Sequence, residues 1–150
     1  TLRHTLFPYT TLFRSLDIFE RICDINPEDE KACLSVINLR YRLGDDELAE
    51  NEIHRYIELL DGKSEQDHII EFLENLRDEL PQKVALRRQL AFAYEDQGEI
   101  EKAIAELDSL GELLLESGQN ALAIETISKI IDFRPPNVEQ YQQLLTQLRE

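Results

Sequence analysis

Residues that break helices recur along this chain at two regular distances. Successive breakers are 17, 20, 17, 17, 20 and 17 residues apart, at Pro27, Gly44, Ser64, Pro81, Gly98, Gly118 and Pro135. Proline cannot continue the interior of a helix, and glycine accepts the left-handed conformation that ends one. Helix-breaking residues at such regular distances indicate a tandem repeat of short helices.

The segments between the breakers have helical periodicity. Apolar residues recur every three or four positions, as at Ile100, Ala103, Ile104 and Leu107, and no segment alternates with the period of two that a half-buried strand requires. Short connections between helices with one apolar stripe force antiparallel stacking. The sequence therefore predicts an all-α chain, an α-solenoid of about eight antiparallel helices, over residues 16–25, 29–43, 46–60, 65–79, 83–97, 100–116, 120–133 and 138–149.

A small residue at a fixed position supports these hairpins. Alanine stands five residues after each of three turn glycines, at Ala49, Ala103 and Ala123, where a small side chain would let two helices approach closely. Helix propensity alone is the other explanation for an alanine at such a position.

Two helix starts carry the spacing of a capping box. Ser64 precedes Asp67 by three residues, and Asn137 precedes Gln140 by the same distance. In a capping box the first side chain bonds a backbone amide of the first helical turn. We therefore predict that Ser64 and Asn137 cap the helices that follow them.

The stretch LAFAYEDQGEIEKAIAELDSL, residues 90–110, resembles the tetratricopeptide repeat. Leu90 and Ala91 stand where the family has Leu-Gly, Tyr94 follows three residues later, Gly98 turns the hairpin, and Ala103 supplies the small contact. Residues 118–137 are similar to a second helix of the repeat, and residues 40–60 are a weaker copy. The resemblance implies TPR-like helical hairpins whose first helices line a groove for a peptide or protein partner.

The chain departs from the 34-residue period of that family. Pro27, Pro81 and Pro135 are 54 residues apart, as are Gly44 and Gly98. This spacing indicates a three-helix unit. Either the array is irregular, or a helix such as 100–116 serves as the second helix of one hairpin and the first of the next.

The first fifteen residues differ in composition from the rest. They contain no acid in a chain with 31 acidic residues, and TLFPYTTLFRS, residues 5–15, matches the translation of a common sequencing adapter. We expect residues 1–15 to be non-native and the helical-repeat domain, a fragment of a longer protein, to span 16–150. A short amphipathic or β-prone N-terminal arm is the alternative.

Charge excludes two classes of partner. Without Arg3 and Arg14, the remaining residues carry 14 basic and 31 acidic side chains, a formal charge of −17. Nucleic acids and anionic membranes require basic surfaces, so neither is expected as a partner. Cys23 and Cys33 lack the spacing of a zinc site. We expect both to be small buried residues in a reducing, cytoplasmic setting.

The sequence contains no catalytic motif. Glu50, His54 and Glu58 are four residues apart on one helical face, which could suggest a metal site, but a solvated face with i,i+4 pairing is far commoner. No phosphate-binding glycine loop or HExxH motif is present. We therefore expect no enzyme activity, no cofactor and no metal.

The resemblance supplies a candidate binding surface. In the first helices of the hairpins, its groove positions would fall on Lys31, Asn38, Arg42, Arg88, Gln89 and Phe92. Leu34 stands where a carboxylate clamp of the family has lysine, which argues against binding of a chaperone tail. We expect a protein-interaction scaffold that binds a peptide with acidic groups beside an apolar anchor. The alternatives are that these are ordinary surface residues, or that the chain is a regulatory or sensor arm of a larger enzyme.

Overall fold

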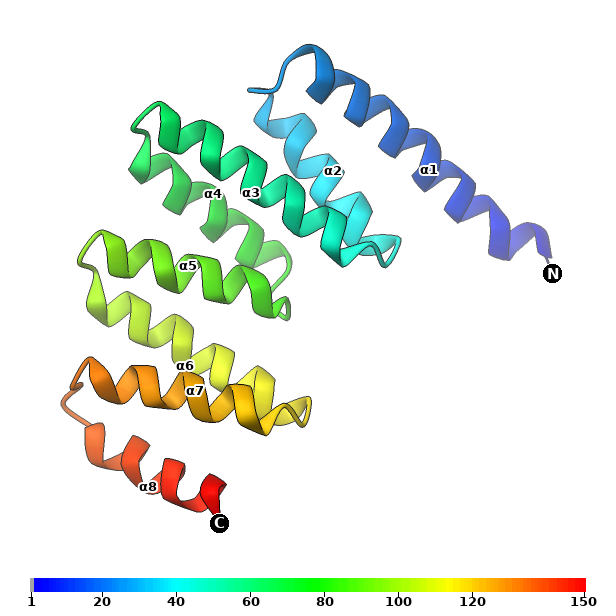
Figure 1. Ribbon diagram of the computed structural model, residues 1–150. Helices are drawn as coiled ribbons and strands as arrows, with labels where there is room; N and C mark the ends of the chain where they lie inside the picture. The colour runs from blue at the N-terminus through cyan, green and yellow to red at the C-terminus, as the bar shows by residue number, and fades with distance from the viewer. Residues whose placement is uncertain (1) are drawn as a thin grey trace. The chain divides into compact units, whose positions relative to one another are not determined.

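The computed structural model describes residues 2–150, with side chains from Tyr9 onward, and these residues form eight helices and no strand (Figure 1). The predicted all-α fold class is confirmed. The helices are α1 (Leu2–Ile25), α2 (Glu30–Arg42), α3 (Asp46–Gly62), α4 (Gln66–Glu79), α5 (Val84–Asp96), α6 (Ile100–Glu116), α7 (Asn120–Asp132) and α8 (Val138–Arg149).

The chain divides into two compact units, one running to Gln66 and the other from Asp67 to Glu150. In the first unit, α2 packs against both α1 and α3. In the second, α6 packs against both α5 and α7, and α8 packs against α7. Turns of a few residues join successive helices, so neighbouring helices within a unit run antiparallel and each unit is a piece of an α-solenoid (Figure 1).

The 54-residue spacing is a property of the helices as well as of the sequence. α2 and α5 begin at residues 30 and 84 and end at 42 and 96. α3 and α6 begin at 46 and 100 and end at 62 and 116, and α4 and α7 begin at 66 and 120. α2 and α3 therefore have the same lengths as α5 and α6, and α4 and α7 begin at equivalent positions.

The turn glycines adopt the conformation predicted for them. Gly44, Gly98 and Gly118 have φ values of 81°, 76° and 77°, a left-handed region that costs glycine nothing and other residues a steric clash. Ser64, at the position equivalent to Gly118, has φ 60°. Ser64 therefore ends α3 as a glycine would, and the prediction that it caps α4 with Asp67 is wrong.

The second predicted capping box forms only in part. Asn137 stands at the N-cap of α8, but its side chain makes no capping bond to the backbone. Its amide nitrogen instead donates to the side-chain oxygen of Gln140, at 3.3 Å. The start of α8 is thus held by a bond between the two side chains.

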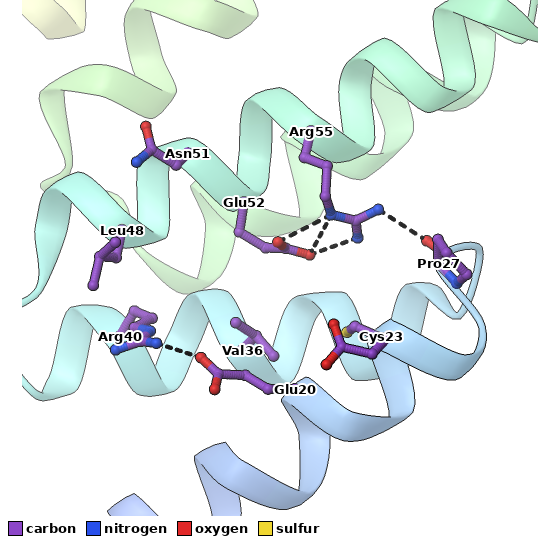
Figure 2. Close-up of a pocket in the computed structure, with 10 residues that line it drawn as sticks. Glu20, Cys23, Pro27, Val36, Arg40, Leu48, Asn51, Glu52 and Arg55 are labelled. Atoms are coloured by element: carbon purple, nitrogen blue, oxygen red, sulfur yellow. Dashed lines mark hydrogen bonds and ion pairs between the residues drawn. The ribbon is translucent and has the colours of Figure 1, made fainter.

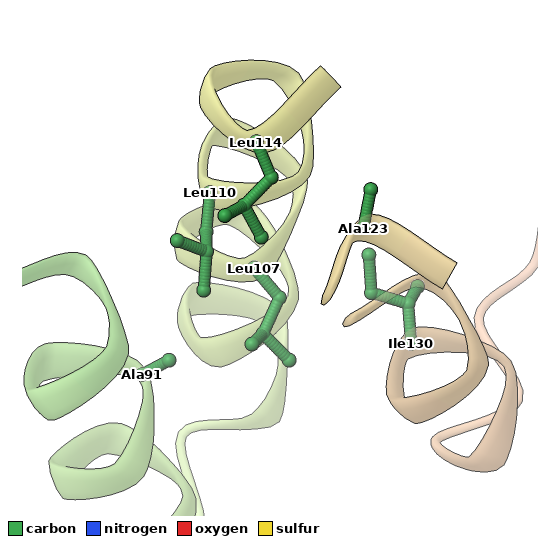
Figure 3. Close-up of a cluster of buried hydrophobic side chains, with 6 residues drawn as sticks. All are labelled: Ala91, Leu107, Leu110, Leu114, Ala123 and Ile130. Atoms are coloured by element: carbon green, nitrogen blue, oxygen red, sulfur yellow. The ribbon is translucent and has the colours of Figure 1, made fainter. Parts of the chain in front are cut away.

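The predicted small contacts are buried. Ala49, Ala103 and Ala123 are all 0% exposed, so each lies where two helices meet. In the second unit the core at these contacts is formed by Ala91 of α5, three leucines of α6, and Ala123 and Ile130 of α7 (Figure 3). α6 thus packs on both sides, as a helix shared between two hairpins must.

The first helix is longer than predicted. α1 was expected over residues 16–25, whereas it runs from Leu2 to Ile25. No breaker lies between Pro8 and Pro27, so nothing in the sequence stops a helix at Leu16. The prediction excluded residues 1–15 for their origin rather than for their helix propensity, and that exclusion set the boundary in the wrong place.

The segment 1–15 lies only in part among the described residues. Thr1 and the side chains of residues 2–8 are outside them. Leu12 packs against the cluster of Leu16, Val36 and Leu39, whereas Tyr9 and Phe13 are 51% and 56% exposed. We call the 54-residue spacing of equivalent positions the 54-residue register. If it extends to the N-terminus, the helix equivalent to α4 would begin at Leu12. The non-native origin of residues 1–15 stays a prediction.

Candidate functional site

The six predicted groove residues are divided between the two units. Lys31, Asn38 and Arg42 lie on α2 of the first unit, and Arg88, Gln89 and Phe92 lie on α5 of the second. Each set is therefore described within its own unit. The prediction that both sets form one inner surface stays a prediction.

Asn38 and Arg42 line a hollow of about 570 Å³ between α1 and α2, with Lys31 outside it. The amide of Asn38 donates to the carbonyl of Leu34 on the same helix, at 3.0 Å, so it already has a partner. Thr11, Leu12 and Ser15 form part of the opposite wall. Because these three residues belong to the segment predicted to be non-native, we assign no function to this hollow.

Arg88 and Phe92 line a groove of about 360 Å³ in the second unit, and Gln89 lies outside it. Leu107 and Leu110 of α6 form its floor and are 5% and 1% exposed. The far wall comes from α7, through Leu122, Glu125, Thr126 and Lys129. The groove thus has an apolar floor on α6 between charged residues on α5 and α7.

Phe92 is the most exposed aromatic ring of this groove, with 56% of its surface open to solvent. The ammonium group of Lys129 lies 5.3 Å from the centre of the ring, within cation–π distance. The same nitrogen is 2.9 Å from Oε2 of Glu95. Lys129 therefore covers one face of Phe92, and Leu122 of α7, which is 38% exposed, lines the same groove.

The two cationic side chains of this groove, Lys129 and Arg88, differ in whether a carboxylate pairs with them. Lys129 is paired with Glu95, whereas no carboxylate among the described residues is paired with Arg88, which is exposed. Arg88 is thus available to a ligand carboxylate, beside the apolar surface of Phe92.

Sequence reasoning missed the α7 side of the groove. It treated residues 120–133 as the second helix of a hairpin and so left Leu122, Glu125 and Lys129 out. In an antiparallel stack every second helix faces the same side, and that rule would have placed α7 with α5. A second hollow of about 530 Å³, which shares Glu125 and Lys129, continues the surface toward Arg149 of α8.

Within the described part of the chain, no group of three His, Cys, Asp or Glu side chains is placed to hold a metal ion. His54 and the two glutamates spaced around it do not form such a group. No helix between residues 2 and 150 is long and apolar enough to cross a membrane.

No family model matches the chain, and no curated protein matches it in sequence. Among solved structures, a thermophilic TPR protein from Thermus thermophilus is 19% identical over 98% of this chain and 95% of its own, with a TM-score of 0.33. A tetratricopeptide repeat protein from Parabacteroides merdae is 18% identical over 95% of this chain and 67% of its own, with a TM-score of 0.32. The structure of this chain itself shows helical hairpins with left-handed glycine turns and fully buried alanines.

Proposed function

We propose that this chain is a protein-interaction scaffold whose groove between α5 and α7 binds a peptide segment of a partner protein. The observation that supports this most directly is the half-exposed Phe92, which shares with the exposed Leu122 a groove that has an apolar floor. A large aromatic ring left open in a concave surface is typical of a binding anchor. The proposal assigns no catalytic role to the chain.

The chemistry of the groove defines the peptide it would accept. An apolar side chain of the peptide would cover Phe92 and Leu122 and bury their exposed surface. A carboxylate two or three residues away would reach Arg88, which no described carboxylate pairs. A reducing, cytoplasmic location belongs to the same proposal, supported by the two free thiols of Cys23 and Cys33.

Selection from a random peptide library tests this proposal. We expect the selected peptides to share one large apolar residue and one acidic residue, and to bind in fluorescence anisotropy. Phe92→Ala should weaken binding by about tenfold or more, since hot-spot residues typically contribute over 1 kcal/mol. Arg88→Ala should lower the affinity for acidic peptides and leave the affinity for their amide analogues unchanged.

Ile18→Ala is the matched control, because Ile18 is an apolar residue on the surface of α1 with the same 56% exposure as Phe92. It should bind the selected peptides as the unmodified chain does. Equal affinity of the Phe92→Ala variant, with its helical dichroism intact, would remove the groove from consideration.

A further inference from the structure

The first unit contains a second concave site, a cavity of about 600 Å³ bounded by α1, α2 and α3 (Figure 2). Three carboxylates line it, from Glu20, Asp24 and Glu52, together with the apolar side chains of Val36 and Leu48. Leu48 is 47% exposed. Every lining residue follows residue 15 in the chain, so the cavity does not depend on the segment predicted to be non-native.

The second unit shows what occupies the equivalent place. The 54-residue register pairs Cys23 with Arg77, Asp24 with Asp78 and Glu52 with Glu106. In the second unit the guanidinium of Arg77 on α4 pairs with Glu106 on α6 and lies 3.0 Å from Oδ1 of Asp78. The two carboxylate positions that hold this guanidinium are therefore kept in the first unit, whereas the arginine is replaced by a short cysteine.

Glu106 accepts two guanidinium groups at once. One oxygen pairs with Arg77, and the other lies 2.9 Å from Nη1 of Arg87. The equivalent of Arg87 is Cys33, which is fully buried. Burial, and next the charge of Glu52, raise the pKa of the Cys33 thiol, so it stays neutral and supplies no positive charge.

In the first unit Glu52 receives one guanidinium, from Arg55 of its own helix, whose Nε lies 3.0 Å from both carboxylate oxygens and whose Nη2 lies 2.6 Å from Oε1. Arg40 is engaged by Glu20 and by Asp45. Asp24 is exposed, and no cation between residues 9 and 150 is paired with it. Glu52 thus binds one guanidinium where Glu106 binds two, and Asp24 lacks the guanidinium partner that Asp78 has.

We propose that this cavity binds the guanidinium of an arginine side chain from a peptide of a partner protein, in the place that Arg77 holds in the second unit. The aliphatic stem of the arginine packs on Val36 and Leu48, and its planar head donates to Asp24 and Glu52. The formal charge of −15 draws such a cationic peptide toward the chain. This site is separate from the groove of α5 and α7 and does not depend on its function.

The probe is a blocked, labelled pentapeptide, Gly-Gly-Arg-Gly-Gly, titrated into the full chain and followed by NMR chemical shifts. We expect saturable binding at one site per chain. A peptide with citrulline in place of arginine keeps the shape and loses the charge, so it should bind at least about tenfold more weakly. Free arginine tests the other source of the same group and should compete only at higher concentration, because it lacks the peptide backbone on either side.

Two pairs of variants use the internal repeat as a control. Asp24→Asn should weaken binding by about tenfold, whereas Asp78→Asn, at the equivalent position already filled by Arg77, should leave it unchanged. Cys23→Arg should fill the cavity from within and abolish binding. Arg77→Cys should open the equivalent place and raise the stoichiometry from one peptide to two.

The substitutions at Asp24 and Asp78 are on exposed carboxylates and should leave the fold intact, so this pair decides the matter even if a cavity variant fails to fold. Equal loss of affinity in Asp24→Asn and Asp78→Asn would show nonspecific attraction to an acidic chain and overturn the proposal. Absence of saturable binding, or equal binding of the citrulline peptide, would overturn it as well.

Discussion

Replacing Glu106 by glutamine tests the polar contact that joins three helices of the second unit. Glu106 is 5% exposed and links Arg77 of α4 and Arg87 of α5 to α6. Glutamine has nearly the same shape, but it removes the charge and turns a donor toward one of the two guanidinium groups.

The expected loss of stability follows from these contacts. A hydrogen bond to a charged group contributes about 1.5–3 kcal/mol, and removing one partner of a fully buried pair costs about 3–5 kcal/mol. Here the side chains of Arg77 and Arg87 are 22% and 18% exposed. Arg77 keeps Asp78, and Arg87 keeps the carbonyl of Pro81 at 3.2 Å. We therefore expect a loss of about 2 kcal/mol, near the lower end of these ranges.

Urea unfolding followed by helical dichroism measures this loss. Glu101→Gln, an exposed position on the same helix, is the control and should change stability by less than about 0.5 kcal/mol. A double-mutant cycle of Glu106→Gln with Arg77→Gln should give a coupling of about 1 kcal/mol. A Glu106→Gln variant as stable as the Glu101→Gln control would refute the view that this contact stabilises the unit.

Two further predictions concern packing. Ala103→Leu should destabilise the chain by about 1–3 kcal/mol through overpacking, because Ala103 is 0% exposed; a neutral result in urea unfolding would contradict the close approach of helices at this residue. Deletion of residues 1–11 should change stability by less than about 1 kcal/mol, since the 54-residue register begins only at Leu12; a larger loss would show that these residues make native contacts.

Local sequence signals predicted most of the fold. Each breaker changes the backbone within a residue or two of itself, so Gly44 and Gly98 marked their turns correctly. The burial of Ala103 followed from its distance to Gly98. Ser64 was misread because a serine after a helix looks the same in sequence whether it ends that helix or caps the next.

The contacts between helices were beyond such signals. Arg77 and Glu106 are 29 residues apart in the chain, and nothing in their neighbourhoods marks them as partners. Arg88 and Phe92, which were transferred from a known repeat, both line this groove, and their role in binding stays a prediction. Its α7 wall was missed because residues 120–133 were treated as the second helix of a hairpin, although the alternation of sides in an antiparallel stack places α7 with α5.

The stacking of α5, α6, α7 and α8 on their neighbours in sequence has a consequence for folding. Such contacts close only short loops, so their entropic cost is small and a hairpin forms quickly. α6 is covered by α5 and α7, whereas α8 has no fully buried residue. We therefore expect α8 to be released before α7 and α6 when the second unit opens transiently, and the amide protons of α6 to exchange with solvent more slowly than those of α8.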